Sequence, residues 1–439
     1  MTLHRIAFLL AACWAPVASA QLRIVTYNTN EGPRSGMSTI LQAIGAESIN
    51  GVARPIDVLA LQEQEYVTTT TQAIVNVLNN IYGAGTYARS TLNVDTSGSG
   101  RPTLIYNTQT VELLGEAAIG SVSSSGGARQ TARYQLRPVG YDSGADFYMY
   151  VSHFKSSDDS TSRNRRNEEA IDIRQNADAL GAGKSIIYAG DLNLYTSSEP
   201  AYQTLLSSGN GQAFDPVSRS GSWSDNSSFR DVHTQSPTTT SHFGGQVTGG
   251  MDDRFDFQLI SSALKDGEGL SYIGTGIPNL HISPSRHSYH AFGNNGTHSL
   301  NGDITSGTGA ASNVLTALTA NSDHLPVVAD YQLPARMSVS SLSGPSRVMK
   351  GSSASASFTV TNSADVAVAI GADELNYTWA GSGSASGSGS GIDNPTGLGN
   401  GHSVSLSTAT TGAKSATVLV SATSAQVPTA EASASRQLS

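Results

Sequence analysis

Strand-like and helix-like patterns of hydrophobic residues alternate along the first three quarters of the chain. Apolar side chains recur with helical spacing over residues 68–82 and 164–180. Segments that are alternating or mostly apolar, as in strands, are residues 22–27, 55–61, 147–151, 185–189, 254–260 and 325–331. Strands that are separated by helices in this way predict an α/β fold.

The composition changes twice beyond this region. Residues 262–321 are rich in Gly, Ser, Asn and His and show little periodicity, which predicts a long loop insertion. After Pro334, alternating segments at 354–361 and 415–421 predict strands, and the Gly/Ser run at 381–391 between them predicts a mobile loop.

We therefore expect two domains. The main domain spans residues 21–333 and includes the insertion, and residues 334–439 form a smaller, immunoglobulin-like β-sandwich. The last strand pattern lies close to Ser439, as it would in a truncated domain.

Residues 1–20 have the pattern of an export signal. A short basic start that includes Arg5 precedes an apolar stretch, residues 6–14, that is too short to span a bilayer. Small residues at 18–20 form a cleavage site, so we expect a mature chain that begins at Gln21 and is secreted outside the cell or into the periplasm; a retained anchor is the alternative. No later stretch is apolar enough to predict a membrane span.

Cysteine and charge restrict the chemistry further. The only cysteine, Cys13, lies in this signal, which excludes disulfides and thiolate metal sites from the mature chain. Any metal is then held by oxygen and imidazole ligands. The net charge is −9, so the chain is not a general polyanion binder, and an anionic substrate would need local basic groups or a bound cation.

One local basic group is the cluster of Arg163, Arg165 and Arg166. It could grip the backbone of a polyanion. The alternative is a solvated helix face on which the arginines pair with Glu168 and Glu169.

Five short segments place a carboxylate, an amide or an imidazole next to the end of a strand pattern. Strand ends are where open α/β folds gather their functional residues. Each segment alone is weak, because Gly-Asp-x-Asn is also a common turn and Asp-His a common helix cap. The five segments are 26–28 with Asn28, 61–63 with Glu63, 151–153 with His153, 190–193 with Asp191 and Asn193, and 322–324 with Asp323 and His324.

Together, in this order and with Arg254-Phe255-Asp256, the segments resemble the endonuclease/exonuclease/phosphatase superfamily. That superfamily includes pancreatic deoxyribonuclease, apurinic endonucleases, bacterial sphingomyelinases and inositol-phosphate phosphatases. The resemblance covers residues 21–333, weakly over 84–145 and 262–321. It implies a four-layer α/β/β/α sandwich, two packed mixed β-sheets flanked by helices, and the metal-dependent hydrolysis of phosphate esters.

Hydrolysis of a phosphodiester favours a hard cation, because the substrate is anionic and repels hydroxide. We expect Mg²⁺ or Mn²⁺, with Ca²⁺ as the alternative, on Glu63, helped by Asn28 and Asp323. The resemblance implies that Asp191 orients or deprotonates the attacking water. It also implies that Asn193 binds a phosphate oxygen, and Asn28 is a second candidate for this contact.

His324 is expected to contact the phosphate and to exchange a proton, since the pKa of imidazole lies near neutrality. An imidazole in this role needs a carboxylate that fixes its tautomer. Asp256 matches the partner that the resemblance implies, and Asp252 and Asp253, which precede the strand, are the alternatives.

Further basic residues have weaker patterns. His153 matches a histidine of the deoxyribonuclease and sphingomyelinase branches, which implies a second acid or a phosphate donor. Lys155 adds a phosphate contact or is an ordinary exposed lysine. Four histidines in the insertion fit no standard metal-site spacing and predict loop histidines: His281, His287, His290 and His298.

These residues favour a secreted endonuclease that hydrolyses DNA or RNA and needs no stable protein partner. A phospholipid or a small phosphate ester is the alternative substrate. We find no counterpart of the aromatic hairpin that sphingomyelinases use on membranes, because Trp223 stands alone and Tyr289 and Phe292 lie among polar residues. A third hypothesis is a non-catalytic binding protein that acts through its C-terminal domain, but every expected catalytic position is filled.

Overall fold

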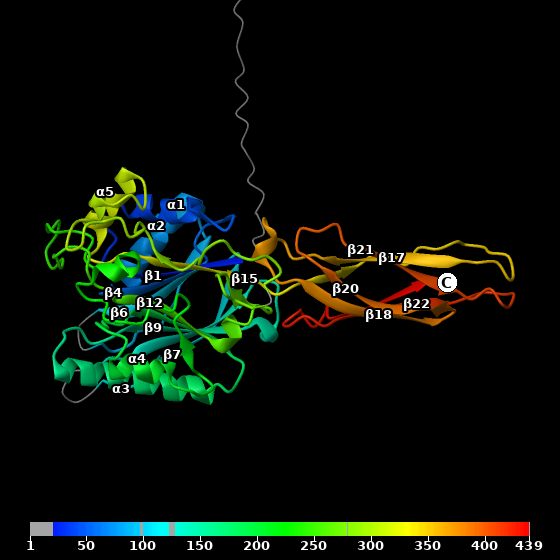
Figure 1. The fold of residues 1–439 in the computed structure, drawn as a ribbon, viewed down its shortest axis with the longest axis horizontal. Helices are drawn as coiled ribbons and strands as arrows, with labels where there is room; N and C mark the ends of the chain where they lie inside the picture. The colour runs from blue at the N-terminus through cyan, green and yellow to red at the C-terminus, as the bar shows by residue number, and fades with distance from the viewer. Residues whose placement is uncertain (1–20, 97–99, 123–127, 279, 439) are drawn as a thin grey trace, which may run out of the picture.

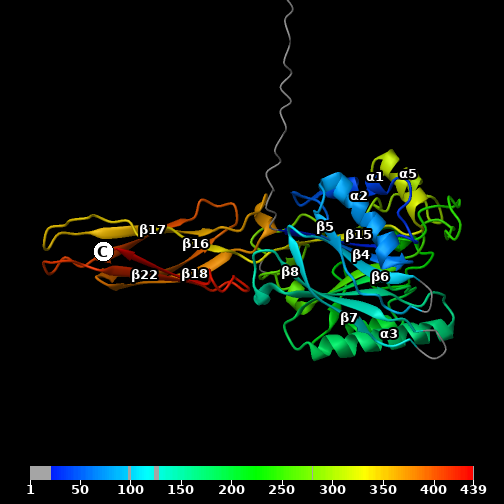
Figure 2. The ribbon, with the colours of Figure 1, turned by 180° about the vertical axis from the view of Figure 1, so that it is seen from behind.

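The computed structural model describes residues 21–96, 100–122, 128–278 and 280–438. The predicted export signal, including Cys13, lies outside these residues. The chain forms a main domain and a β domain that extends from one side of it, so the molecule is elongated (Figures 1 and 2). None of the helices in the described part of the chain has the length and apolarity needed to cross a bilayer.

The first sheet of the main domain has strand order β13-β15-β1-β4-β6-β5, and β14 also pairs with β15. In its centre, β1 is parallel to β4 and antiparallel to β15. Its strands are β1 (Gln21–Asn28), β4 (Val58–Gln64), β5 (Tyr87–Arg89), β6 (Arg101–Asn107), β13 (Ser271–Tyr272), β14 (His290–Ala291) and β15 (Val327–Gln332).

The second sheet has strand order β11-β12-β10-β9-β8-β7. In its centre, β10 is parallel to β9 and antiparallel to β12. Its strands are β7 (Val111–Ile119), β8 (Thr131–Pro138), β9 (Phe147–His153), β10 (Ser185–Asp191), β11 (Ala213–Phe214) and β12 (Asp256–Ser261). A separate short pair is β2 (Ser48–Ile49) with β3 (Val52–Ala53).

The two sheets pack face to face, and helices cover their outer faces (Figure 1). Side chains alternate across β1, so that Ile24 enters the core between the sheets and Val25 enters the core under the helices. Helices α1 (Met37–Ala46), α2 (Gln72–Tyr82) and α5 (Ser312–Asn321) cover the first sheet, and α3 (Ser160–Ala179) and α4 (Pro200–Leu206) cover the second. This confirms the four-layer α/β/β/α sandwich.

Residues 262–321 are more ordered than the expected loop. Short strands β13 and β14 add to the edge of the first sheet, and α5 ends the segment. Val314, Leu315 and Leu318 of α5 are buried in the core under the first sheet. Their spacing is helical, but the surrounding Gly, Ser and Asn residues obscured it.

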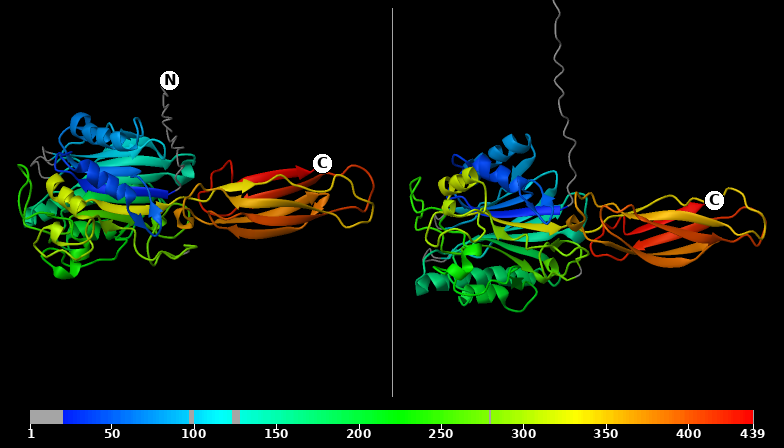
Figure 3. Two further views of the ribbon diagram at one scale, coloured as in Figure 1. Left: turned by 90° about the horizontal axis from the view of Figure 1, so that it is seen from above. Right: turned by 45° about the horizontal axis from the view of Figure 1, so that its top comes forward.

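The C-terminal domain is a sandwich of two four-stranded antiparallel sheets, as expected (Figure 3). One sheet has the order β16-β17-β21-β19 and the other β20-β18-β22-β23, around a core that includes Phe358 and Val418. The strands are β16 (Met337–Val339), β17 (Ser355–Asn362), β18 (Leu375–Gly383), β19 (Ala385–Ser386), β20 (Ser388–Asp393), β21 (Asn400–Leu406), β22 (Ala416–Ala422) and β23 (Ser433–Leu438).

The Gly/Ser run at 381–391 belongs to these strands, so the prediction of a mobile loop there was wrong. Trp379 on β18 lies opposite Gly389 on β20. A Cβ atom at Gly389 would stand 3.0 Å from the indole, so the ring covers the glycine backbone and replaces the side chain that the strand lacks.

The C-terminal domain is attached to the first sheet at the end where strand β1 begins. Leu333 follows β15, whose last residue, Gln332, pairs with Gln21. Around this junction Arg336 forms an ion pair with Glu431, and the hydroxyl of Tyr141 donates to the carbonyl of Pro334 at 2.8 Å. The residues expected in the functional site lie at the opposite end of β1, at Asn28.

Candidate active site

The register of the second sheet places three expected site residues in one row. Asp191, the last residue of β10, lies opposite His153, the last residue of β9. Asp256, the first residue of the antiparallel strand β12, lies opposite Asp191 on the other side. Asp191 follows Ile187 and Ala189 on the face that is turned toward the first sheet, so the row faces the gap between the sheets.

Gly190 allows this row to form. A Cβ atom at Gly190 would stand 2.0 Å from the carbonyl oxygen of Ser152 on the neighbouring strand, and the residue has a φ of +137°. A side chain here would push β10 away from β9, and Asp191 would move away from His153.

The first sheet brings Asn28 and His324 together at one end of its central strands. Asn28 ends β1 on the inner face, and His324 lies just before β15, which runs antiparallel to β1. The hydroxyl of Ser322 donates to the carbonyl of Asn28 at 2.6 Å and accepts from the backbone N–H of His324 at 3.1 Å. Ser322 thereby fixes the loop that carries His324 to the end of β1.

Glu63 reaches the site through an irregularity in β4. The pairing of β4 with β6 shifts register between Leu61 and Gln64, and Glu63 has a φ of +56°. Such a bulge turns a side chain away from strict alternation. Gly100 of the neighbouring segment makes room for it, since a Cβ atom there would stand 2.6 Å from the Cα atom of Glu63.

His324 forms a buried pair with Asp256, whose carboxylate lies 2.7 Å from Nδ1. Asp256, rather than Asp252 or Asp253, is therefore the carboxylate in contact with this imidazole. Nε2 lies 3.6 Å from Asp191. Burial alone would lower the pKa of His324, but Asp256 and Asp191 outweigh it, so the pKa is raised well above its ordinary value.

Gln235 also contacts His324, at 2.7 Å from Nε2. When Nδ1–H donates to Asp256 in a neutral ring, Nε2 accepts from the Gln235 amide. An imidazolium donates from both nitrogens, so the amide then has to present its oxygen. Gln235 lies in an irregular segment without periodicity, and no sequence pattern pointed to it.

Glu63, His153 and Asp191 form a cluster of oxygen and nitrogen atoms that could hold a cation, all within 4.8 Å of one another. The amide of Asn28 donates to Glu63 at 3.0 Å and to Asp191 at 3.2 Å. His153 Nε2 lies 3.5 Å from Glu63 and 3.6 Å from Asp191.

The electrostatics of this cluster fit a divalent cation. Burial raises the pKa of Glu63, and Asp323 adds to the rise. Burial also raises the pKa of Asp191 to about 7, with contributions from Asp256 and Glu63. Crowded, desolvated carboxylates of this kind repel one another until a cation or a proton compensates them.

Asp323 and Asn193 lie in the same pocket and make local hydrogen bonds as well. The carboxylate of Asp323 accepts from the Asn30 amide at 3.2 Å and from the N–H of Val247 at 2.9 Å. The backbone N–H of Asn193 donates to Asp191 at 3.0 Å in an Asx turn, and its amide donates to the carbonyl of Phe154 at 3.1 Å. The Asx turn expected for Gly-Asp-x-Asn is therefore present, and Asn193 still lines the pocket.

Lys155 does not line the pocket. Its ammonium donates to the carbonyl of Ser156 at 3.0 Å, and its backbone N–H donates to Glu169 at 3.0 Å. The basic side chain at the pocket is instead that of Arg129, which sequence analysis missed because it follows a Ser/Gly stretch. Arg129 donates to the carbonyls of His153 at 3.2 Å and Phe154 at 2.7 Å.

The pocket is an open cavity of about 500 Å³. Its rim includes the aromatic pair Tyr195 and Phe255, whose ring centroids lie 4.9 Å apart at an interplanar angle of 70°. The lining residues are Glu31, Glu63, Gly100, Arg129, His153, Ser156, Ser157, Asp191, Asn193, Tyr195, Gln235, Val247, Phe255, Asp323 and His324.

The remaining basic candidates have structural partners. The arginine cluster fits the alternative of a solvated, paired helix face only at Arg165, which pairs with Glu168; Arg163 pairs with Asp158, and Arg166 is buried and pairs with Glu199. The four insertion histidines contact separate groups, namely Ala369 for His281, Tyr272 and Thr275 for His287, Glu47 for His290 and Asn294 for His298.

Comparisons with known proteins give distant structural similarity. No family model and no curated protein matches the chain. The human Nocturnin catalytic domain with bound sulfate is 16% identical over 72% of this chain and 95% of its own, with a TM-score of 0.41. An endonuclease/exonuclease/phosphatase family protein from Bacteroides thetaiotaomicron is 12% identical over 71% and 94%, with a TM-score of 0.41. TDP2 of D. rerio, complexed with a single-strand DNA product, is 14% identical over 71% and 99%, also with a TM-score of 0.41.

Proposed function

We propose that this chain is a secreted, divalent-metal-dependent phosphodiesterase of the endonuclease/exonuclease/phosphatase type, and that its substrate is DNA or RNA. The observation that carries the proposal is that five separated segments meet at one place: Glu63, His153, Asp191 and His324 line one pocket, and Asn28 donates to Glu63 and Asp191 behind it. There the imidazole–carboxylate pair of His324 and Asp256 lies next to the cation-compatible cluster of Glu63, His153 and Asp191, with Nε2 of His324 3.6 Å from Asp191.

The chain's own residues supply groups for proton transfer next to a bound phosphate. His324, held as an imidazolium by Asp256, is placed to contact a phosphate oxygen and to give a proton to the leaving oxygen. Asp191 has a pKa of about 7 through burial and is placed to orient the water and take its proton. His153, in the same row, is a second proton donor.

Glu63, helped by Asn28 and Asp323, would hold Mg²⁺ or Mn²⁺, with Ca²⁺ as the alternative. The ion would neutralise phosphate charge and the charge that develops on the leaving oxygen. Asn193 and Arg129 are placed to bind the remaining phosphate oxygens.

The aromatic pair at the rim supports a nucleic-acid substrate. Tyr195 is partly exposed at the pocket, and its ring lies at 70° to the ring of Phe255. A flat, partly exposed ring next to a phosphate site suits the face of a nucleobase, and stacking of this kind is tolerant of sequence. Secretion rests on the pattern of residues 1–20, and mature protein recovered outside the cell should begin at Gln21.

A small diester tests the reaction, and a substrate panel tests the specificity. We expect hydrolysis of bis-p-nitrophenyl phosphate with Mg²⁺ or Mn²⁺, its loss in Glu63→Ala and His324→Ala, and its retention in Asp158→Ala, which removes an exposed carboxylate outside the pocket. Metal-dependent hydrolysis that survives in His324→Ala would overturn the assignment of the site.

The substrate panel compares plasmid DNA, RNA and sphingomyelin, each with wild-type protein and Glu63→Ala. We expect nucleic acid to be cleaved. Cleavage of sphingomyelin alone would replace the nuclease proposal by the phospholipid alternative, and would leave the reaction type intact.

A further inference from the structure

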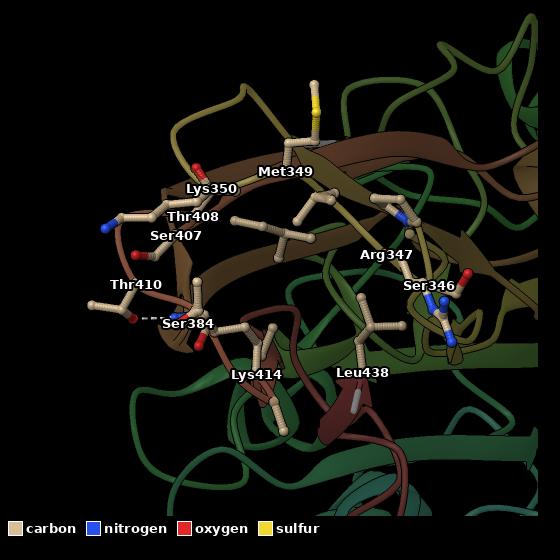
Figure 4. A pocket seen from close by; sticks show the side chains of 18 residues that line it. Ser346, Arg347, Met349, Lys350, Ser384, Ser407, Thr408, Thr410, Lys414 and Leu438 are labelled. Carbon is tan, nitrogen blue, oxygen red and sulfur yellow. Dashed lines mark hydrogen bonds between the residues drawn. The ribbon is translucent and has the colours of Figure 1, made fainter.

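A second cavity lies at the free end of the C-terminal domain, which extends away from the main domain and the site described above (Figure 1); Figure 4 shows its lining residues. Two loops form it, residues 344–351 before β17 and residues 407–414 between β21 and β22. We call these two loops the distal tip. The cavity has a volume of about 620 Å³ and lies between the two sheets, with Leu406 and Leu438 among its apolar lining residues.

The distal tip is basic within an acidic chain. Arg347, Lys350 and Lys414 line the cavity, and no carboxylate of the described residues does so. Lys414 donates to the hydroxyl of Thr410, an uncharged partner. The domain's acidic side chains lie instead near the main domain, at strand ends or in the loops of that end: Asp365, Asp373, Glu374, Asp393 and Glu431.

The first loop of the distal tip, residues 344–351, also exposes apolar side chains between its two cations. Val348 is 43% exposed and Met349 is 80% exposed, and they are flanked by Arg347 and Lys350. Met349 points away from the cavity, toward the outside of the molecule (Figure 4). An exposed apolar pair inside a basic cluster matches a surface that is anionic at its boundary and apolar just beneath it.

The position of the distal tip separates it from the substrate pocket. The C-terminal domain joins the main domain where β1 begins, and the pocket lies where β1 ends, a length of about 25 Å at the usual strand rise. Strand β18 adds about 30 Å more in the opposite direction. A short oligonucleotide held in the pocket therefore does not reach the distal tip.

We propose that the distal tip is a membrane-docking site for anionic phospholipid headgroups, with Val348 and Met349 entering the interface and Arg347, Lys350 and Lys414 contacting the phosphates. It anchors the chain peripherally and holds the pocket away from the bilayer. Free polyanions would satisfy the cations but leave the exposed apolar pair in water.

Co-sedimentation with vesicles tests this directly. We expect the Glu63→Ala protein to bind phosphatidylcholine vesicles that contain phosphatidylglycerol more tightly than pure phosphatidylcholine vesicles, and to lose this preference in high salt. Lys350→Ala/Lys414→Ala should weaken the binding roughly 30-fold, because each cation near an anionic surface contributes about fivefold. Met349→Ser should weaken it about tenfold.

The matched control is Lys184→Ala/Lys265→Ala, which removes two exposed cations from the main domain and should leave vesicle binding unchanged. All variants should keep the wild-type circular dichroism spectrum. Equal losses in the two double variants would overturn the proposal. So would equal binding to neutral vesicles, or Lys350/Lys414-dependent binding of a soluble DNA oligonucleotide without vesicle binding.

Discussion

The buried ion pair between Arg254 and Asp215 supports the strand that carries Asp256, and its loss should be costly. The guanidinium is fully buried and the carboxylate 4% exposed, with N–O distances of 2.8 and 3.0 Å. Burial alone would lower the pKa of Arg254, but Asp215 and Tyr289 outweigh it and raise the pKa, so the guanidinium stays charged. Asp215→Asn would therefore leave a buried cation without its counter-charge.

Removing one partner of such a pair costs about 3–5 kcal/mol. For a main domain of 313 residues, 21–333, this is a fall of roughly 5–8 °C in Tm. Asp158→Asn is the matched control, because the Asp158–Arg163 pair has a similar distance of 2.7 Å but is 41–49% exposed, so that solvent screens it and its loss should change stability little.

Urea unfolding followed by tryptophan fluorescence measures both variants. Trp223 is fully buried with its ring 5.4 Å from Arg254, so in a Trp379→Phe background the signal reports on the main domain. An apolar double variant, Asp215→Leu with Arg254→Met, should recover much of the loss. A loss of unfolding free energy in Asp215→Asn no larger than that in Asp158→Asn would refute the stabilising role of the buried pair.

Three further predictions concern the pocket and acid stability. Gly100→Ala should displace Glu63 and reduce metal-dependent turnover more than it reduces stability, measured by titrating Mg²⁺ and by thermal unfolding; an unchanged Mg²⁺ dependence would contradict it. Asp256→Asn should keep the fold but lower kcat about 10²–10⁴-fold, because His324 loses the carboxylate that fixes its tautomer; wild-type kcat would refute this. Burial lowers the pKa of His298 in the folded chain to about 4, below its ordinary value of about 6.5. Between these values the unfolded chain binds a proton on this imidazole and the folded chain does not. Acidification from about pH 6.5 toward 4 should therefore lower the free energy of unfolding, by about 1–2 kcal/mol at pH 5. His298→Gln should show a smaller fall in its urea midpoint over this range than the wild type.

The sequence predicted the residues at strand ends better than the residues between strands. Asn28, His153 and Asp191 follow apolar strands whose alternation determines which face each side chain occupies. Arg129 and Gln235 lie in irregular segments, where position depends on contacts such as that between the Arg129 backbone and Glu169 on α3. No local pattern encodes a contact between residues this far apart.

Glu63 is an intermediate case. Its residue type and place after a strand were visible, but the bulge that turns its side chain inward depends on Gly100 from the next segment. The run at 381–391 shows the converse error, since its composition predicted a loop and the indole of Trp379 makes it a strand. Composition describes the side chains that a segment has, and not the neighbours that cover it.

The row of Asp256, Asp191 and His153 has a consequence for how this molecule can diversify. Its members lie on three paired strands. A shift of one residue in the pairing register would turn every side chain of a strand to the other face, so few substitutions or insertions are tolerated there. The rim of the pocket comes from separate connections that carry Glu31, Gln235 and Val247. Those connections can be lengthened or rebuilt, with a change in what the pocket accepts, while the row of Asp256, Asp191 and His153 stays unchanged.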